Sequence, residues 1–184
     1  MSQFFRPPET PSNLDLPTIF LAGPVQGAHD WQSEMGEQLL RSGFSMNVAS
    51  PRRADMEDPA VRAAFDQEAQ FAQIDWELHN IHQAIKFGVL VVNFVAQDTS
   101  IEYPAGRAYA QTTRFEAGGA ILGQEFFDGH ANIALRIDPQ YRGGNETYIR
   151  RIANRSNIPV LTDNGGLVGA VLSKLPSPTS SIHS

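Results

Sequence analysis

Two glutamates attract attention because their predicted surroundings should alter their acidity. Glu77 lies among apolar residues that recur every three or four positions, namely Phe71, Ile74, Leu78, Ile81 and Ile85. This spacing predicts a helix whose apolar stripe packs against a sheet. A carboxylate on or beside such a stripe has a raised pKa, unless it forms an ion pair with an arginine. Asp75 flanks the same stripe from the other side.

Glu116 lies in the segment TTRFEAGGAIL. With Thr112 or Thr113 as the N-cap of a helix, Glu116 falls within the first turn or so, where the helix dipole favours an ionised carboxylate. The spacing of three between Thr113 and Glu116 also fits a capping box, which would be a purely structural arrangement. The following segment, AGGA, contains two glycines, which weaken a helix and suggest close approach to a sheet or a ligand.

Five short apolar runs predict the strands that position these carboxylates, at residues 18–22, 46–49, 89–95, 132–137 and 158–161. Helical patterns alternate with them, at 30–40, 58–85, 112–122, 146–154 and 167–175. Such alternation implies right-handed crossovers and a parallel sheet covered on both faces. We therefore expect an α/β fold, a flavodoxin-like, doubly wound three-layer sandwich with a five-stranded parallel sheet in the order 2-1-3-4-5. One domain should span residues 17–175, between an N-terminal tail (1–16) and a C-terminal tail (176–184).

In this architecture, ligands bind beyond the carboxyl ends of the strands, where the strand order reverses. The loops at residues 23–30 and 96–111 should meet there. In the first loop, GPVQG places Gly23, Pro24 and Gln26 either against a ligand or in a tight turn before the N-cap Asp30. Trp31 either stacks on a ligand or belongs to the core.

Composition narrows the classes of function. The chain has 184 residues, 41% of them hydrophobic, and a formal net charge of -6 without a basic block. This argues against nucleic acid or a membrane surface as the main partner. There are no cysteines, and the five histidines are scattered, so we expect neither a metal nor a cofactor. The N-terminus lacks the apolar run of a signal peptide, and we expect a cytoplasmic protein.

Several motifs, taken in order, resemble nucleoside 2-deoxyribosyltransferases and their relatives. The resemblance covers roughly residues 17–165. It rests on IFLAGP at 19–24, the nearby Trp31, IDWEL at 74–78, VLVVNF at 89–94 and TTRFEAG at 112–118. It implies a pentosyltransferase of nucleotide salvage that moves 2-deoxyribose from one nucleobase to another. Its substrates would be deoxynucleosides and free bases, and the protein would be a homo-oligomer, at least a dimer.

The resemblance also implies roles for individual residues. Glu116 matches the glutamate that attacks C1′ and forms a deoxyribosyl ester. Glu77 matches the acidic residue that handles the proton of the departing and incoming base, with Asp75 as its near neighbour. This chemistry calls for an ionised nucleophile and for a second, partly buried carboxyl group that holds a proton near pH 7.

Two positions depart from the family pattern. Phe20 stands where many members have a tyrosine that hydrogen-bonds the nucleophile, so Tyr103 or Tyr109 would have to replace it. Ala110 stands where members often have an aspartate that holds sugar hydroxyls. The candidates to replace that aspartate are Asp98, Glu102, Thr112 and Thr113.

Two other functions fit the same fold. One is an N-glycosidase that hydrolyses nucleoside 5′-monophosphates, for which Arg107 or Arg114 would supply positive charge although GPVQGAHD lacks serine. The other is a nucleotide sensor without catalysis, and the pair of Glu77 and Glu116 argues against it.

Overall fold

A six-stranded, all-parallel sheet forms the centre of the protein in the computed structural model, which describes residues 1–55, 59–101, 103, 106–123 and 132–176. The strand order is β1-β3-β2-β4-β5-β6. The strands are β1 (Gln3–Phe5), β2 (Thr18–Ala22), β3 (Asn47–Ala49), β4 (Val89–Phe94), β5 (Ile133–Ile137) and β6 (Val160–Leu161). The helices are α1 (Trp31–Leu40), α2 (Pro59–Ala63), α3 (Gln67–Phe87), α4 (Gln111–Gly123), α5 (Glu146–Arg155) and α6 (Asn164–Leu172).

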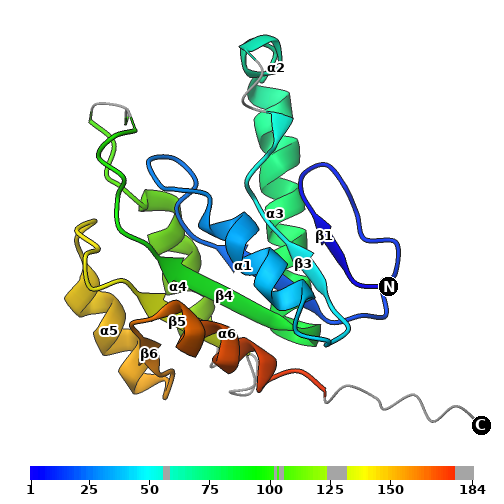
Figure 1. Cartoon of the computed structure of the whole chain (residues 1–184). Coiled ribbons are helices and arrows are strands. Elements are labelled where there is room, and N and C mark those ends of the chain that lie inside the picture. Colours follow the sequence, from blue (N-terminus) through cyan, green and yellow to red (C-terminus); the bar gives the residue numbers. More distant parts are fainter. Residues whose placement is uncertain (56–58, 102, 104–105, 124–131, 177–184) are drawn as a thin grey trace, which may run out of the picture.

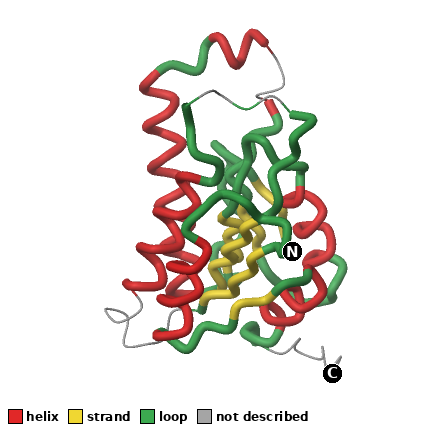
Figure 2. Tube along the Cα trace, turned by 90° about the vertical axis from the view of Figure 1, so that its left-hand side faces the viewer, coloured by secondary structure: helices red, strands yellow, loops and turns green. Residues whose placement is uncertain are grey.

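Helices cover both faces of the sheet (Figures 1 and 2). The chain moves from β2 to β3 in one direction through α1, and then back across β2 to β4 through α3. Because such crossovers are right-handed, α1 and α3 lie on opposite faces. α6 contacts α1 on the first face, while α4 lies beside α5 and contacts β2 and β4 as α3 does. The prediction of a flavodoxin-like, doubly wound sandwich is confirmed.

The strand count differs from the prediction by one. The five predicted strands are present in the predicted order, and β1 adds a sixth at the edge, pairing in parallel with β3. This strand lies in the segment 1–16 that we expected to be a tail. Its three residues, QFF, are too short to show a periodicity, and the prolines that follow dominate the local composition. Most of the predicted C-terminal tail, residues 177–184, lies outside the described residues.

The prediction that the apolar stripe of α3 packs against the sheet is wrong for its N-terminal part only, since Ile81 and Ile85 do pack against the core. Phe71, Ile74 and Leu78 are 56%, 42% and 52% exposed. The residues of α3 that are buried, Asn80, Ala84 and Ile85, all belong to its C-terminal half. The N-terminal half rises past the end of the sheet (Figure 1), so it has no sheet to cover and presents polar residues to a cavity instead.

Candidate active site

A cavity of about 430 Å³ opens beyond the carboxyl ends of β2 and β3 and beside the start of α4, within the range of about 300–1,000 Å³ typical of small-molecule sites. This is the predicted edge of the sheet, beside the switch in strand order between β2 and β4. The lining comprises residues 23–26 after β2, Pro51, Arg53 and Phe65 after β3, Gln70, Gln73, Ile74 and Glu77 of α3, and Tyr103, Arg107, residues 110–113 and Glu116 around the start of α4.

Glu77 and Glu116 line this one cavity from two different helices. Glu77 lies at the middle of α3, where the helix leaves the sheet, and Glu116 lies in α4. The charge of Glu77 contributes to the raised pKa of Glu116, as expected for two carboxylates in one site. The structure therefore brings together the two groups that the sequence singled out.

The acidity of Glu116 differs from the prediction. Burial, and then the nearby charge of Glu77, raise the pKa of Glu116 to about 7. The helix begins at Gln111, so Glu116 lies in its second turn, beyond the reach of the helix dipole. Neither Thr112 nor Thr113 is the N-cap, and the predicted capping box is absent because Thr113 lies inside the helix, 3% exposed.

Glu77 has one hydrogen-bond donor. Burial raises its pKa, and the hydrogen bond from Gln73 opposes that effect. The Gln73 Nε2 donates to Glu77 Oε1 over 2.8 Å and also lies 3.3 Å from the Pro51 carbonyl. Glu77 is thus connected both to its own helix and to the loop that follows β3.

Gly23 begins the wall formed by the loop after β2. A Cβ atom at this position would lie 2.4 Å from the Trp31 ring and 2.6 Å from the Asn93 carbonyl oxygen, so only glycine fits. Trp31 lies behind the loop, 2% exposed, and its Nε1 donates to the Pro24 carbonyl over 3.0 Å. The structure therefore places Gly23, Pro24 and Gln26 at the cavity and Trp31 in the core.

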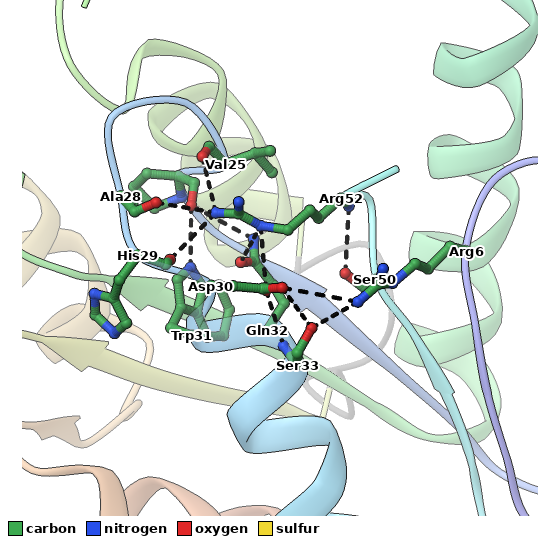
Figure 3. Close-up of polar contacts among 11 residues, drawn as sticks. Arg6, Val25, Ala28, His29, Asp30, Trp31, Gln32, Ser33, Ser50 and Arg52 are labelled. Atoms are coloured by element: carbon green, nitrogen blue, oxygen red, sulfur yellow. Dashed lines mark hydrogen bonds and ion pairs between the residues drawn. The ribbon is translucent and has the colours of Figure 1, made fainter. Parts of the chain in front are cut away.

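Arg52 holds this loop in place (Figure 3). Its Nη2 donates to the carbonyls of Val25, Ala28 and His29 over 2.9, 3.1 and 3.2 Å, and its Nε lies 3.2 Å from Asp30 Oδ1. One guanidinium group thus binds three carbonyls of the loop, and we regard it as the main support of this wall.

Asp30 links Arg52 to the start of α1. It is the predicted N-cap, and it accepts hydrogen bonds from the Ser33 amide and hydroxyl (Figure 3). Burial alone would raise the pKa of Asp30, but these bonds and the charges of Arg52 and Arg6 outweigh burial and lower it. Asp30 therefore remains the ionised centre of a network that positions the loop.

Of four other predicted binding residues, one lines the main cavity and three lie outside it. Thr113 lines the cavity, whereas Asp75 and Asp98 do not. Asp98 accepts hydrogen bonds from the Ser100 amide and hydroxyl in a tight turn. Arg114 donates to the Gly143 carbonyl and lines a second cavity, between α4 and α5. The geometry of the main cavity thus lends no support to substrate contacts by Asp75, Asp98 or Arg114.

The tyrosines proposed to replace the family's strand tyrosine have other partners. The Tyr103 hydroxyl lies 3.2 Å from the Ala108 carbonyl, and the Tyr109 hydroxyl lies 3.2 Å from the carbonyls of Val95 and Ala96. Within the described residues, we find no hydrogen bond that holds the Glu116 carboxylate. Glu102, proposed to hold the sugar, lies outside the described residues.

Four residues of the cavity were not predicted from the sequence, namely Arg53, Phe65, Gln70 and Gln73. Arg53 pairs with Asp55 over 2.5 Å, and its guanidinium carbon lies 5.3 Å from the centre of the Phe65 ring. A signal for Gln73 was present, since it precedes Glu77 by four residues and therefore shares its face of the helix. Arg53 gave no local signal, because its place depends on the path of the loop after β3.

The described residues hold no group of three or more histidine or acidic side chains placed to bind a metal ion. Nor does any helix in the described part of the chain have the length and apolar character needed to cross a membrane.

Fold and site together define a doubly wound α/β protein with a paired-carboxylate cavity at the switch in strand order. Residues 16–117, more than half of the chain, match the family described as nucleoside 2-deoxyribosyltransferase-like, and the chain belongs to this family. The match ends one residue after Glu116 and includes both carboxylates. Family membership indicates a nucleoside-modifying enzyme. No curated protein sequence matches the chain.

Proposed function

We propose that the protein is a nucleoside 2-deoxyribosyltransferase, which exchanges the nucleobase of 2′-deoxynucleosides. The observation that carries the proposal is that Glu77 and Glu116 line one cavity, close enough for the charge of one to affect the pKa of the other. Glycosyl transfer with retention needs such a pair, since one carboxylate attacks the anomeric carbon while the other moves a proton.

The first half of the reaction forms an ester on Glu116. A Glu116 carboxylate oxygen attacks C1′, the bond from C1′ to the base nitrogen breaks, and the base leaves with a proton from Glu77. In the second half, a nitrogen of the incoming base attacks C1′ and the ester bond breaks. Glu77 takes the proton that the incoming base loses, and two inversions at C1′ give net retention.

The protonation of the site suits this cycle near neutral pH. Two carboxylates in a buried cavity repel each other, so they share one proton over a wide pH range and titrate as a pair. With the pKa of Glu116 at about 7, one proton is available to the pair at physiological pH. In the free site the charge of Glu77 favours the proton on Glu116. The reaction therefore starts from the less populated arrangement, in which that proton has passed to Glu77 and Glu116 is the anion.

The substrates follow from the small cavity and its mixed lining. The loop from Gly23 to Gln26 and the side chain of Ile74 both contribute to the lining, which offers backbone and apolar surface to a flat base. Thr112 and Thr113 lie near Glu116 at the start of α4, where they would face sugar hydroxyls.

A base-exchange assay tests the proposal. Incubation with deoxyinosine and adenine should yield deoxyadenosine and hypoxanthine by chromatography, whereas a hydrolase would release hypoxanthine alone. Glu116→Gln should lower the rate by roughly 10³-fold or more, because a neutral amide cannot form the ester. Undiminished exchange by this variant would contradict the role of Glu116.

Hydrolysis of nucleoside 5′-monophosphates is the second candidate, and the two arginines of the cavity favour it. Arg53 and Arg107 line the same cavity as the carboxylates, although Arg53 already pairs with Asp55. A parallel assay with deoxyinosine 5′-monophosphate decides between them, since release of hypoxanthine from the nucleotide but not from the nucleoside would support this alternative. A thermal shift with nucleosides but no turnover of either substrate would instead indicate a sensor.

We also propose that the protein forms a homo-oligomer through α3. Phe71, Ile74 and Leu78 form an exposed apolar stripe on this helix, at positions i, i+3 and i+7, and Ile74 also borders the cavity. Such a stripe is the usual way in which a helix packs against a partner.

A further inference from the structure

Gln73 connects the proton-handling carboxylate to a second element of the fold. Its Nε2 lies 2.8 Å from Glu77 Oε1 and 3.3 Å from the Pro51 carbonyl oxygen. An amide nitrogen carries two hydrogens, so it can serve both acceptors at once. The Gln73 side chain thus bridges the cavity side of α3 and the end of β3.

This bridge matters because the turns of α3 that precede Trp76 have little other support. Trp76 itself is held by the Phe5 ring and by the Glu9 carbonyl. The buried residues of the helix begin at Asn80, and Phe71 and Ile74, which flank Gln73 in sequence, are exposed. Figure 1 shows this part of the helix beyond the sheet. Trp76 holds the helix next to Glu77, and Gln73 adds the link between the Glu77 side chain and the loop after β3.

The bridge also distinguishes the two oxygens of Glu77. A Gln73 N–H can only donate, so Oε1 is an acceptor whether Glu77 is ionised or neutral. We infer that Gln73 is a positioning residue, which occupies Oε1 so that the proton exchanged with the nucleobase is carried on Oε2. This inference rests on the proposed function, in which Glu77 transfers that proton.

Other charged groups line the same cavity as Glu77. Glu116 faces it from α4, Arg53 from the loop after β3 and Arg107 from the loop before α4. Asp75 flanks it on its own helix but does not line the cavity. Among these groups, Arg53 has a carboxylate partner in Asp55. The hydrogen bond from Gln73 lowers the pKa of Glu77 against the opposing effect of burial, so its loss should raise that pKa.

Gln70 provides a matched control. It precedes Gln73 by one turn and lines the same cavity, but no hydrogen bond joins it to Glu77 within the described residues. Gln70→Leu and Gln73→Leu therefore remove the same amide from the same cavity, and only the second removes the bridge. Gln73→Ala adds a variant that opens the site to water instead of drying it.

The first measurement follows the Glu77 carboxyl carbon by NMR during a pH titration of the substrate-free, ¹³C-glutamate-labelled protein. We expect Gln73→Leu and Gln73→Ala to move the Glu77 titration upward by about 0.5–1 pH unit, and Gln70→Leu to leave it in place. A Glu77 titration in Gln73→Leu that coincides with the wild type would overturn the inference. So would an equal shift in Gln70→Leu.

The second measurement is the pH dependence of base exchange. Loss of the bridge should lower kcat by about 10- to 100-fold with a smaller change in KM, and it should move the basic limb of the profile to higher pH. Gln70→Leu should leave that limb in place. If the wild type exchanges no bases, the proposed function fails, but the NMR titration still decides whether Gln73 controls Glu77. If exchange occurs and neither kcat nor the limb responds to Gln73→Leu, the positioning role fails alone.

Discussion

Burial of Glu116 affects folding as well as chemistry. Its pKa is raised to about 7 in the folded protein, against about 4.3 for an unperturbed glutamate in the unfolded chain. The folded protein thus binds this proton more tightly than the unfolded chain does. Below pH 4 the group is neutral in both states. Between about pH 4.3 and pH 7 the unfolded chain releases its proton while the folded protein keeps it. The free energy of unfolding therefore falls as the pH rises through this range.

Glu116→Gln should therefore stabilise the protein at alkaline pH. We expect its free energy of unfolding at pH 8 to exceed that of the wild type by roughly 1–3 kcal/mol, and the difference to vanish near pH 4. Denaturant unfolding at both pH values measures this. Glu34→Gln, at an exposed position on α1, serves as the control and should change stability by less than about 0.5 kcal/mol at either pH. Equal stability of Glu116→Gln and the wild type at pH 8 would show that burial does not penalise the charged form.

At the scale of the element, the loop after β2 depends on an arginine from a different part of the chain. Arg52 donates to three carbonyls of the loop and pairs with Asp30 (Figure 3). Carbonyls that lose a charged donor must find water or remain unsatisfied. The same loop supplies Gly23, Pro24 and Gln26 to the cavity, so its order should influence substrate binding.

Arg52→Ala should destabilise the protein by about 2 kcal/mol or more and raise KM more than it lowers kcat. Chemical denaturation and steady-state base exchange measure the two effects. Arg41→Ala is a suitable control, since Arg41 forms an exposed ion pair with Glu37 on α1 that contributes little. A KM equal to that of the wild type in a folded Arg52→Ala variant would show that the loop is ordered without the hydrogen bonds from Arg52.

The elements also show what local sequence patterns can and cannot predict. The apolar run VLVV at the start of β4 predicted a strand correctly, because a strand covered on both faces needs few polar residues. The N-cap Asp30 was equally visible, since capping depends on adjacent residues. The stripe of α3 misled the analysis because the cavity, and not the sheet, occupies the inner face of the helix at Gln73 and Glu77.

A site residue could be predicted from the sequence where it departed from the pattern of its neighbours, and could not be predicted where it did not. Glu77 was visible because a carboxylate beside an apolar stripe is costly. Arg53 was hidden because its approach to the cavity depends on how the loop after β3 folds. The predicted effect of the helix dipole on Glu116 is absent because α4 starts at Gln111, before both predicted N-caps, so that Glu116 lies in the second turn.

At the scale of the whole molecule, the N-terminal segment joins the sheet edge to the helix that carries Glu77. β1 pairs with β3, and Phe5 lies edge-on to Trp76, with ring centres 5.7 Å apart. The Trp76 Nε1 donates to the Glu9 carbonyl over 2.7 Å. These contacts hold the middle of α3, while Phe71 and Leu78 of its apolar stripe remain exposed.

That stripe allows a test of the oligomer. Replacement of Phe71 and Leu78 together by serine should leave the free energy of unfolding per chain little changed in the dissociated state, because both side chains are more than half exposed. It should nevertheless shift the sedimentation coefficient from that of an oligomer toward that of a single 20.2 kDa chain, because the removed apolar area no longer favours association. Leu14→Ser is the control, since Leu14 is 79% exposed but lies outside the stripe. A wild type that sediments as a single chain at micromolar concentration, or a double variant that remains associated, would rule out α3 as the interface. If the wild type sediments as a single chain, self-association does not explain the exposed stripe.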